Sequence, residues 1–209
     1  MNSFERDAYQ SGYRFIAGID EAGRGPLAGP VVAAAVILPQ DYHNSEIRDS
    51  KQLSAQKREK LHDVIMESAL AVGVGVVEAA VIDKINILRA TLKAMKEALR
   101  SLSPAPDFLL IDGITPLSLS TPQQTIVKGD SKSISIAAAS IIAKVSRDRI
   151  MAIYHRQFPL YNFLKNKGYG TKEHREAIRR YGMCKIHRKS FKITDKLSIP
   201  ETGDLFDVS

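Results

Sequence analysis

The chain has 209 residues, of which 44% are hydrophobic, a length and composition typical of one soluble domain with a substantial core. Its one cysteine, Cys184, excludes an internal disulfide, and no apolar run is long enough to span a membrane. Residues 1–7 contain no basic region followed by an apolar one, so we expect no signal peptide. We therefore expect a cytoplasmic protein.

Basic residues outnumber acidic ones by 30 to 23, which gives a net charge of +7. The excess lies in residues 165–192, where ten basic residues and two acidic ones give +8 and leave the rest of the chain at −1. This segment also contains Tyr169, Tyr181 and two histidines. It is typical of a surface that binds a phosphate backbone and stacks on sugars or bases, although a solvated basic helix is the alternative.

The first half of the chain predicts two strands, then a helix, a strand and a second helix. The strands at residues 14–20 and 31–38 are joined by a turn rich in Gly and Pro, so we expect them to pair antiparallel. Ser54 and Asn86 are typical helix N-caps. The later elements are expected at residues 54–69 (helix), 70–77 (strand) and 86–102 (helix).

The second half continues with short apolar runs and one long Ala-rich segment. The run 108–111 predicts a buried strand, residues 126–129 a short strand leading into Asp130, and residues 135–158 a long helix. Thr171 begins a further helix that ends near residue 181, and the tail from residue 192 is expected to be irregular.

Two adjacent carboxylates, Asp20 and Glu21, come directly after the apolar run 15–19 and lead into Gly23-Arg24-Gly25. Carboxylate oxygens suit hard cations such as Mg²⁺, and the glycines expose the backbone to a substrate. Successive strand residues point to opposite faces, so both acids can serve one site only if the strand ends there. A solvated acidic turn is the alternative.

Two more acids repeat this pattern. Asp112 follows the run 108–111 and precedes a glycine, while Asp130 follows residues 126–129 at the junction with the long helix. Taken alone, Asp130 could also have the ordinary structural role of an acidic residue at a helix N-terminus. Four carboxylates at the ends of neighbouring strands could hold two metal ions about 3.5–4 Å apart, which is the arrangement for hydrolysis of a phosphodiester.

The chain resembles bacterial ribonuclease HII over nearly its whole length. The strings that carry the resemblance are GIDEAGRGPLAGPVVAAAVILP from Gly18, DSKQLS from Asp49, IDG around Asp112, KGDSKS from Lys128, AAASIIAKVSRDR from Ala137 and NKGYGTKEH from Asn166. The resemblance implies an α/β fold, a ribonuclease H-like mixed sheet flanked by helices with a helical C-terminal extension. We expect a catalytic domain at 1–158 and a basic helical extension and tail at 159–209, packed on the same domain.

The resemblance also implies an activity: endonucleolytic hydrolysis on the 5′ side of ribonucleotides in RNA/DNA hybrids and in DNA duplexes with embedded ribonucleotides, which removes misincorporated ribonucleotides. Asp20, Glu21, Asp112 and Asp130 match the family's catalytic and metal-binding carboxylates, with Mg²⁺ or Mn²⁺ as cofactor in a two-metal mechanism. We expect a monomer that acts without a membrane.

The resemblance also implies contacts with the substrate. It implies that the turn Gly23-Arg24-Gly25 contacts the ribose 2′-hydroxyl at the junction and that Tyr169 packs on the adjoining deoxyribose. The 2′-hydroxyl distinguishes RNA from DNA, so backbone groups exposed by glycines are suitable readers.

Several further polar residues are candidates for substrate contact. Ser140 and Lys144 share a helix face, and with Lys51 they could contact the phosphate backbone. Close packing of Ser140 and a salt bridge or solvation of Lys144 are the alternatives. Asp148 is too far along the helix from the other acids to be a ligand, so we assign it to an ion pair. His174 is the histidine expected nearest the substrate, with a plain helix-surface role as alternative.

Two other readings of the whole chain stay open at this point. A nucleic-acid binding module could keep the fold without catalysis, but the presence of all four carboxylates favours the enzyme. Ribonuclease HIII is disfavoured, because it carries a sizeable N-terminal domain and only 19 residues precede Asp20 here.

The acidic tail ends in a segment that resembles clamp-binding peptides of bacterial replication proteins, although it lacks their leading glutamine. In this hypothesis Leu205 and Phe206 fill an apolar pocket on the sliding clamp. A tail without a partner, or one folded back on the domain, is the alternative.

Overall fold

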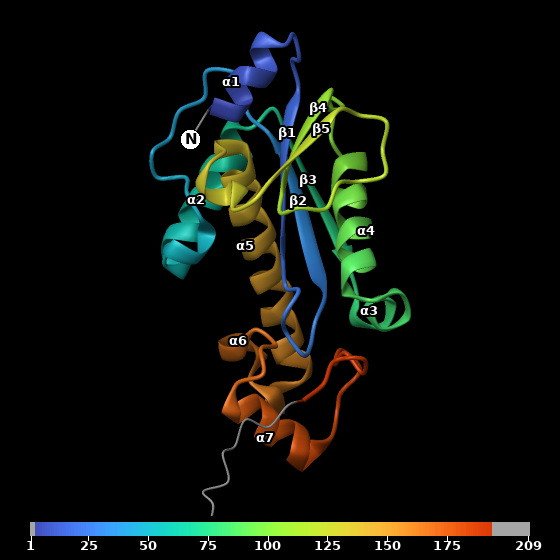
Figure 1. Ribbon diagram of the computed structural model, residues 1–209. Coiled ribbons are helices and arrows are strands. Elements are labelled where there is room, and N and C mark those ends of the chain that lie inside the picture. The colour runs from blue at the N-terminus through green and yellow to red at the C-terminus, as the bar shows by residue number, and fades with distance from the viewer. Residues whose placement is uncertain (1–2, 194–209) are drawn as a thin grey trace, which may run out of the picture.

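A computed structural model describes residues 3–193, in which helices cover both faces of a five-stranded sheet (Figure 1). The strands are β1 (Ile16–Ala22), β2 (Val31–Ile37), β3 (Ala71–Val77), β4 (Phe108–Asp112) and β5 (Gln123–Ile126). The helices are α1 (Ser3–Gln10), α2 (Ala55–Ser68), α3 (Ala79–Ile85), α4 (Ile87–Arg100), α5 (Ile134–Gln157), α6 (Phe163–Asn166) and α7 (Lys172–Tyr181). The 3₁₀ turns are η1 (Ser50–Gln52), η2 (Gly129–Ser131) and η3 (Pro159–Tyr161).

The strand order is β3-β2-β1-β4-β5, with β1 at the centre of a mixed sheet. β1 pairs antiparallel with β2 through Ala22, whereas its parallel pairing with β4 ends at Ile19. β5 is parallel to β4 on the far side. From Asp20 onward the β4 side of β1 therefore lacks a paired strand, and this opens the end of the sheet to side chains and solvent.

The apolar run of β2 is buried on both faces, as the absence of polar alternation predicts. Its odd-numbered residues pack with β1, β4 and α4 in one core, and its even-numbered residues pack with α2 and α5 in another. In Figure 1 these helices lie on opposite sides of the sheet. The sheet is thus the middle layer of a three-layer structure, and its strand ends are left to form a site.

α5 lies very close to β1 because small residues face each other across the contact. A Cβ atom added at Gly18 would lie 2.1 Å from the carbonyl carbon of Ser135, so any larger residue would push the helix away. Ala137, Ala138 and Ala139 on the helix are fully buried. This close approach fixes the position of α5, which begins directly after the turn that carries Asp130.

The C-terminal extension has a small core of its own. In Figure 1 it lies at one end of the molecule, around the last turns of α5. The core residues are Ala28, Met151, Tyr161, Phe163, Ala177, Ile178 and Ile186. Because Ala28 belongs to the connection between β1 and β2, this core joins the extension to the turn that follows the acidic strand.

Most predicted elements are confirmed. The mixed sheet flanked by helices is present, and the four predicted helices agree to within about two residues. Ser54, Asn86 and Thr171 cap their helices with side-chain hydrogen bonds from the amides of Lys57, Arg89 and His174. The division into domains after residue 158 stays a prediction.

Two strand predictions are wrong. β1 does not end at Asp20 but continues to Ala22, because β2 offers a paired edge that far. The short strand leading into Asp130 ends earlier, at Ile126, and Asp130 lies on η2, where Lys128 adopts a left-handed conformation that ends extended pairing. The helices α1, α3 and α6 lie outside the predicted elements. No helix within residues 3–193 is both long and apolar enough to cross a bilayer.

Candidate active site

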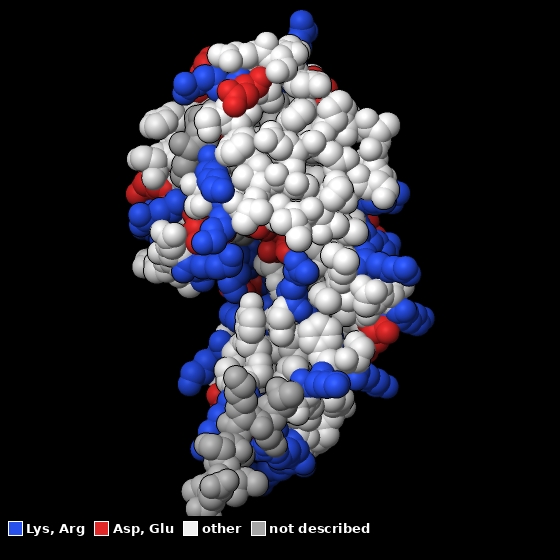
Figure 2. Space-filling view, viewed as in Figure 1, with Lys and Arg blue, Asp and Glu red and all other residues white. Residues whose placement is uncertain are grey.

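A cleft of about 250 Å³ opens at the end of β1. Figure 2 shows acidic side chains in a hollow between the sheet body and the extension, with Lys and Arg at its rim. The cleft is lined by Asp20, Glu21, Ala22, Gly23, Arg24, Gly25, Ser50, Lys51, Asp112, Ser140, Lys144, Arg147 and Tyr169. Of the eleven predicted site residues, ten line this cleft, and the remaining one, Asp130, contacts the cleft residue Lys51.

Asp20 and Glu21 both line the cleft although β1 runs through them. Asp20 has the same orientation as Gly18, toward α5, and is only 5% exposed. Its Oδ1 accepts a hydrogen bond from the backbone amide of Glu21 at 2.7 Å. Glu21 lies beyond the last residue paired with β4, and its Oε1 contacts Arg24 Nη1 at 3.3 Å. The open edge of β1, rather than a strand end at Asp20, brings both acids to one cleft.

Asp112 is tied to the turn that carries Asp130. Its Oδ1 accepts a hydrogen bond from the amide of Gly129 at 2.7 Å. The glycine permits this approach, since an added Cβ would lie 2.6 Å from Ile136. Because β4 is parallel to both β1 and β5, Asp112 ends its strand at the same edge of the sheet as the other acids.

Burial and repulsion between carboxylates raise the pKa values of Asp20 and Glu21. Burial raises the pKa of Asp20 well above its ordinary value, and the carboxylates of Glu21 and Asp112 raise it further. Burial also raises the pKa of Glu21, although Arg24 opposes the rise. The ionised forms of these carboxylates are therefore destabilised unless a positive charge compensates them.

Lys51 supplies part of that charge. Its Nζ lies 3.4 Å from Asp130 Oδ2, while its side chain is 79% exposed. Burial and the neighbouring Asp49 raise the pKa of Asp130, and Lys51 opposes the rise. Burial alone lowers the pKa of Lys51, but Asp130, Asp49 and Asp20 outweigh it and raise the pKa. Asp49 also caps η1 by accepting from the amide of Lys51, which fixes the backbone of this turn.

The donor set is suited to a hard divalent cation. Buried carboxylates whose pKa values are raised by one another are stabilised by a cation, and oxygen ligands fit Mg²⁺ or Mn²⁺. Within the described part of the chain, no three His, Cys, Asp or Glu side chains converge into a ready metal-ligand group as they lie. The assignment of Asp20, Glu21, Asp112 and Asp130 as metal ligands thus stays a prediction.

The candidates on α5 have protein partners. Ser140 is buried, and its hydroxyl lies 2.7 Å from that of Ser50 on η1. Lys144 Nζ forms an ion pair with Asp148 at 2.7 Å, which confirms the ion-pair assignment of Asp148. Burial lowers the pKa of Lys144, and Asp148 opposes this effect. Contact of Ser140 and Lys144 with a phosphate backbone stays a prediction.

The turn at residues 23–25 is held from behind by a buried arginine that the sequence analysis did not identify. A Cβ at Gly23, where φ is +96°, would lie 2.0 Å from Arg147 Nε, so glycine is required. Arg147 donates hydrogen bonds to the carbonyl oxygens of Pro30, Ala28 and Lys167. Its guanidinium carbon lies 6.0 Å from the centre of the Tyr169 ring, which links the turn to the extension.

Tyr169 is held by a chain of two buried histidines. His174 Nδ1 lies 2.8 Å from the carbonyl oxygen of Tyr169, and its Nε2 lies 3.1 Å from His187 Nε2. The amide of Cys184 donates to His187 Nδ1 at 2.9 Å. These contacts fit neutral rings in which His187 Nε2–H donates to His174 and His174 Nδ1–H donates to Tyr169. The alternative of a plain helix-surface role for His174 is wrong, because the ring is fully buried, and its position as the histidine nearest the substrate stays a prediction.

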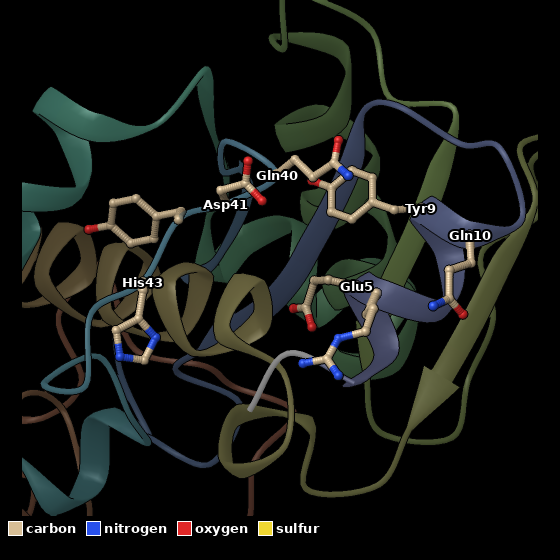
Figure 3. Close-up of a pocket in the computed structure, with 8 residues that line it drawn as sticks. Glu5, Tyr9, Gln10, Gln40, Asp41 and His43 are labelled. Carbon is tan, nitrogen blue, oxygen red and sulfur yellow. The ribbon is translucent and has the colours of Figure 1, made fainter.

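A larger pocket, of about 430 Å³, lies away from the acids, between α1 and the loop after β2 (Figure 3). Its most buried member, Glu5, lies beside the first turn of α5. Glu5 Oε1 accepts hydrogen bonds from the Ser133 hydroxyl and, at 3.0 Å, from the Ser135 amide. A carboxylate is favourable at a helix N-terminus. α1 thus braces the start of α5 close to the turn of Asp130.

Comparison with known proteins agrees with the fold and the cleft. The sequence profile of ribonuclease HII matches residues 17–194. The ribonuclease HII of Syntrophus aciditrophicus is 69% identical over 208 residues, which cover 99% of this chain and 98% of that protein. The chain belongs to the ribonuclease HII family.

Solved structures of archaeal proteins share the fold. The ribonuclease H2 of Pyrococcus horikoshii superposes with a TM-score of 0.70 at 27% identity, covering 85% of this chain and 94% of that chain. The ribonuclease HII in a PCNA complex from Archaeoglobus fulgidus gives a TM-score of 0.72 at 26% identity, with coverages of 87% and 97%. The ribonuclease H-like fold predicted from the sequence is therefore confirmed.

The histidine pair makes stability depend on pH. Burial, with a contribution from His174, lowers the pKa of His187 to about 4, against about 6.5 in an unfolded chain. Between these values the unfolded state binds the additional proton, so stability present above pH 6.5 is lost as the pH falls toward 4, by up to about 3 kcal/mol. Urea unfolding at pH 7 and pH 5 measures this loss.

The variant His187→Phe keeps an aromatic ring but removes the titration. It should be less stable at pH 7, because two polar groups lose their partner, and should lose less stability than the wild type between pH 7 and pH 5. His43→Asn, which alters an exposed histidine, is the control. Equal pH dependence of the wild type and His187→Phe would contradict the prediction.

Proposed function

We propose that this protein is a metal-dependent endonuclease that hydrolyses the phosphodiester on the 5′ side of ribonucleotides in RNA/DNA hybrids and in DNA duplexes with embedded ribonucleotides. Its role is the removal of misincorporated ribonucleotides. The observation that carries the proposal is that three acids, the Gly-Arg-Gly turn and Tyr169 line one cleft in a chain of the ribonuclease HII family.

The carboxylates of Asp20, Glu21, Asp112 and Asp130 hold Mg²⁺ or Mn²⁺ in this proposal. Bound divalent ions would supply a water nucleophile at neutral pH and stabilise charge on the phosphate. The protein contributes the fixed acids: Asp20 is restrained by the amide of Glu21, and Asp112 by the amide of Gly129. Hydrolysis breaks the bond from phosphorus to the 3′ oxygen of the upstream deoxyribose, leaving a 3′-hydroxyl on DNA and a 5′-phosphate on the ribonucleotide.

Substrate recognition in the proposal divides between sugar and phosphate contacts. Gly23, Arg24 and Gly25 read the ribose 2′-hydroxyl, and the half-exposed ring of Tyr169 packs on the neighbouring deoxyribose. Lys51, with its long exposed side chain above the acids, is the best placed cation for the phosphate. Lys144 and Ser140 complete the phosphate contacts from α5.

Asp20→Asn and Asp130→Asn test the metal ligands. Each should lower kcat by at least about 100-fold and leave affinity for a duplex with one embedded ribonucleotide within about twofold, because the basic surface is untouched. Nicking with Mg²⁺ or Mn²⁺ and with a chelator gives the rate, and fluorescence anisotropy gives the affinity. Asp63→Asn, an exposed acid on α2, is the control. Near-normal nicking by Asp20→Asn or Asp130→Asn would refute that ligand.

Tyr169→Ala should lower the preference for a single embedded ribonucleotide over an all-hybrid duplex, by about tenfold in the ratio of kcat/KM values, because the ring that packs on the deoxyribose is lost. Tyr169→Phe keeps the ring and should keep the ratio. Arg24→Ala should reduce the ratio in the same direction. An unchanged ratio in Tyr169→Ala would remove Tyr169 from junction recognition.

We also propose that Leu205 and Phe206 dock on the sliding clamp. Both residues lie outside the described residues, and the support is the sequence resemblance together with the archaeal structure that pairs ribonuclease HII with PCNA. Calorimetric titration of the clamp with a peptide of residues 196–209 should give a dissociation constant in the micromolar range, about −8 kcal/mol. A Leu205→Ala/Phe206→Ala peptide should release no heat. Equal heats for both peptides would exclude this docking mode.

A further inference from the structure

Arg188, in the C-terminal extension, is buried behind the Gly-Arg-Gly turn. Only 1% of its surface is exposed. Its guanidinium donates to the carbonyl oxygen of Gly23 at 2.6 Å, of Arg24 at 2.9 Å and of Gly29 at 3.0 Å. Its own amide donates to the Leu27 carbonyl at 2.8 Å. The extension thereby holds two successive carbonyl groups of the turn with one side chain.

The contact is charge-assisted but involves no ion pair. No carboxylate in residues 3–193 lies within ion-pair distance of Arg188. The backbone carbonyls and the Phe191 ring, whose centre lies 4.9 Å from the guanidinium carbon, compensate its burial. The planar fork of an arginine can reach several acceptors in fixed directions, which a compact lysine ammonium cannot. The position therefore requires an arginine for its geometry as well as its charge.

The orientation of the carbonyls fixes the orientation of the amides. In a planar trans peptide, C=O and N–H point in opposite directions. With the carbonyls of Gly23 and Arg24 directed at Arg188, the amides of Arg24 and Gly25 point away from it. Among the described residues these amides have no acceptor, and both residues line the cleft. Gly25 also lies beside the ring of Tyr169, 3.9 Å from where a Cβ would be.

We propose that Arg188 is a positioning residue for ribonucleotide recognition: it holds the carbonyls of Gly23 and Arg24 so that the amides of Arg24 and Gly25 face the 2′-hydroxyl of the ribonucleotide. Arg188 acts through the turn and does not touch the substrate. The inference rests on the proposed sugar-reading function of that turn. It makes the discrimination between ribonucleotide and deoxyribonucleotide depend on an arginine more than 160 residues away in the sequence.

Arg188→Lys keeps the positive charge but loses the planar set of N–H donors that bonds to several carbonyls. We measure the affinity of the full-length protein, in a chelator, for an all-DNA duplex and for the same duplex with one ribonucleotide. The preference for the ribonucleotide duplex should fall by about tenfold, the effect of losing aligned hydrogen bonds to one hydroxyl. Affinity for the all-DNA duplex should stay within about twofold, because phosphate contacts are retained. A merely structural defect would weaken both affinities together.

Lys189→Ala is the matched control, since it removes an exposed positive charge from the next residue without altering the carbonyl contacts. It should keep the wild-type preference. A folded Arg188→Lys protein with the wild-type preference overturns the inference while leaving the proposed function intact. A wild-type protein that binds both duplexes equally overturns the sugar-reading function of the turn, and the inference with it.

A second variant covers the case in which Arg188→Lys does not fold. Cys184, the one cysteine of the chain, allows a synthetic peptide of residues 184–209 to be ligated to a thioester of residues 1–183. Citrulline at position 188 then keeps the shape but replaces one donor nitrogen by an oxygen, which repels a turn carbonyl. The same loss of preference is expected relative to a ligated wild-type chain. A retained preference overturns the inference.

Discussion

The structure depends on two buried guanidinium groups that bond to backbone carbonyls instead of carboxylates. Arg147 and Arg188 together hold the carbonyl oxygens of Gly23, Arg24, Ala28, Gly29 and Pro30, at both ends of the connection between β1 and β2. Burial lowers the pKa of both groups, yet an arginine stays protonated at neutral pH. Each is expensive to bury, and the carbonyls offset that cost together with one aromatic ring each, Tyr169 for Arg147 and Phe191 for Arg188. Arg147 thus joins the connection to α5, and Arg188 joins it to the extension.

This arrangement separates the chemistry of the cleft from its selectivity. The acids are fixed by the sheet and by the turn after β5, and their positions depend on strand pairing and on the close packing of α5 against Gly18. The groups proposed to read the sugar are held by the extension, through Arg188 behind the turn and through the histidine pair behind Tyr169. The two sets meet where the β4 side of β1 is open. Under the proposed function, a change in the extension would therefore alter discrimination while the carboxylates remain in place.

The sequence predicted those parts of the site whose signal is local. Each acid follows an apolar run and is next to a glycine or another acid, and the helix caps Ser54, Asn86 and Thr171 are recognisable by residue type. Asp130 was correctly expected near the start of α5, but its 3₁₀ turn was not, because the preceding strand is stopped by Lys128 in a left-handed conformation. The end of β1 depends on its pairing with β2, which no local pattern reveals.

The buried arginines could not be found in this way. In a segment with ten basic residues, a pattern of charge predicts a solvated surface, and nothing in the local sequence distinguishes Arg188 from Lys185 or Lys189. What distinguishes it is a set of carbonyl acceptors contributed by residues 23–29, distant in sequence and brought close by the fold. The only local hint of burial near Arg188 was the preceding residue, His187, because histidine is buried more often than lysine or arginine.

The proposed function gives the charge of the extension two uses. Of the ten basic residues in residues 165–192, Arg188 is buried and is occupied by the turn, whereas the other nine remain at least partly accessible. Phosphate attraction depends on the accessible charges and is screened by salt, while a buried contact is screened much less. Under the proposed function, affinity for nucleic acid and recognition of the ribonucleotide would thus respond to salt differently, although both would arise from cations of the same short segment. The local charge of +8 bears on affinity for nucleic acid. It gives no information about recognition of the ribonucleotide.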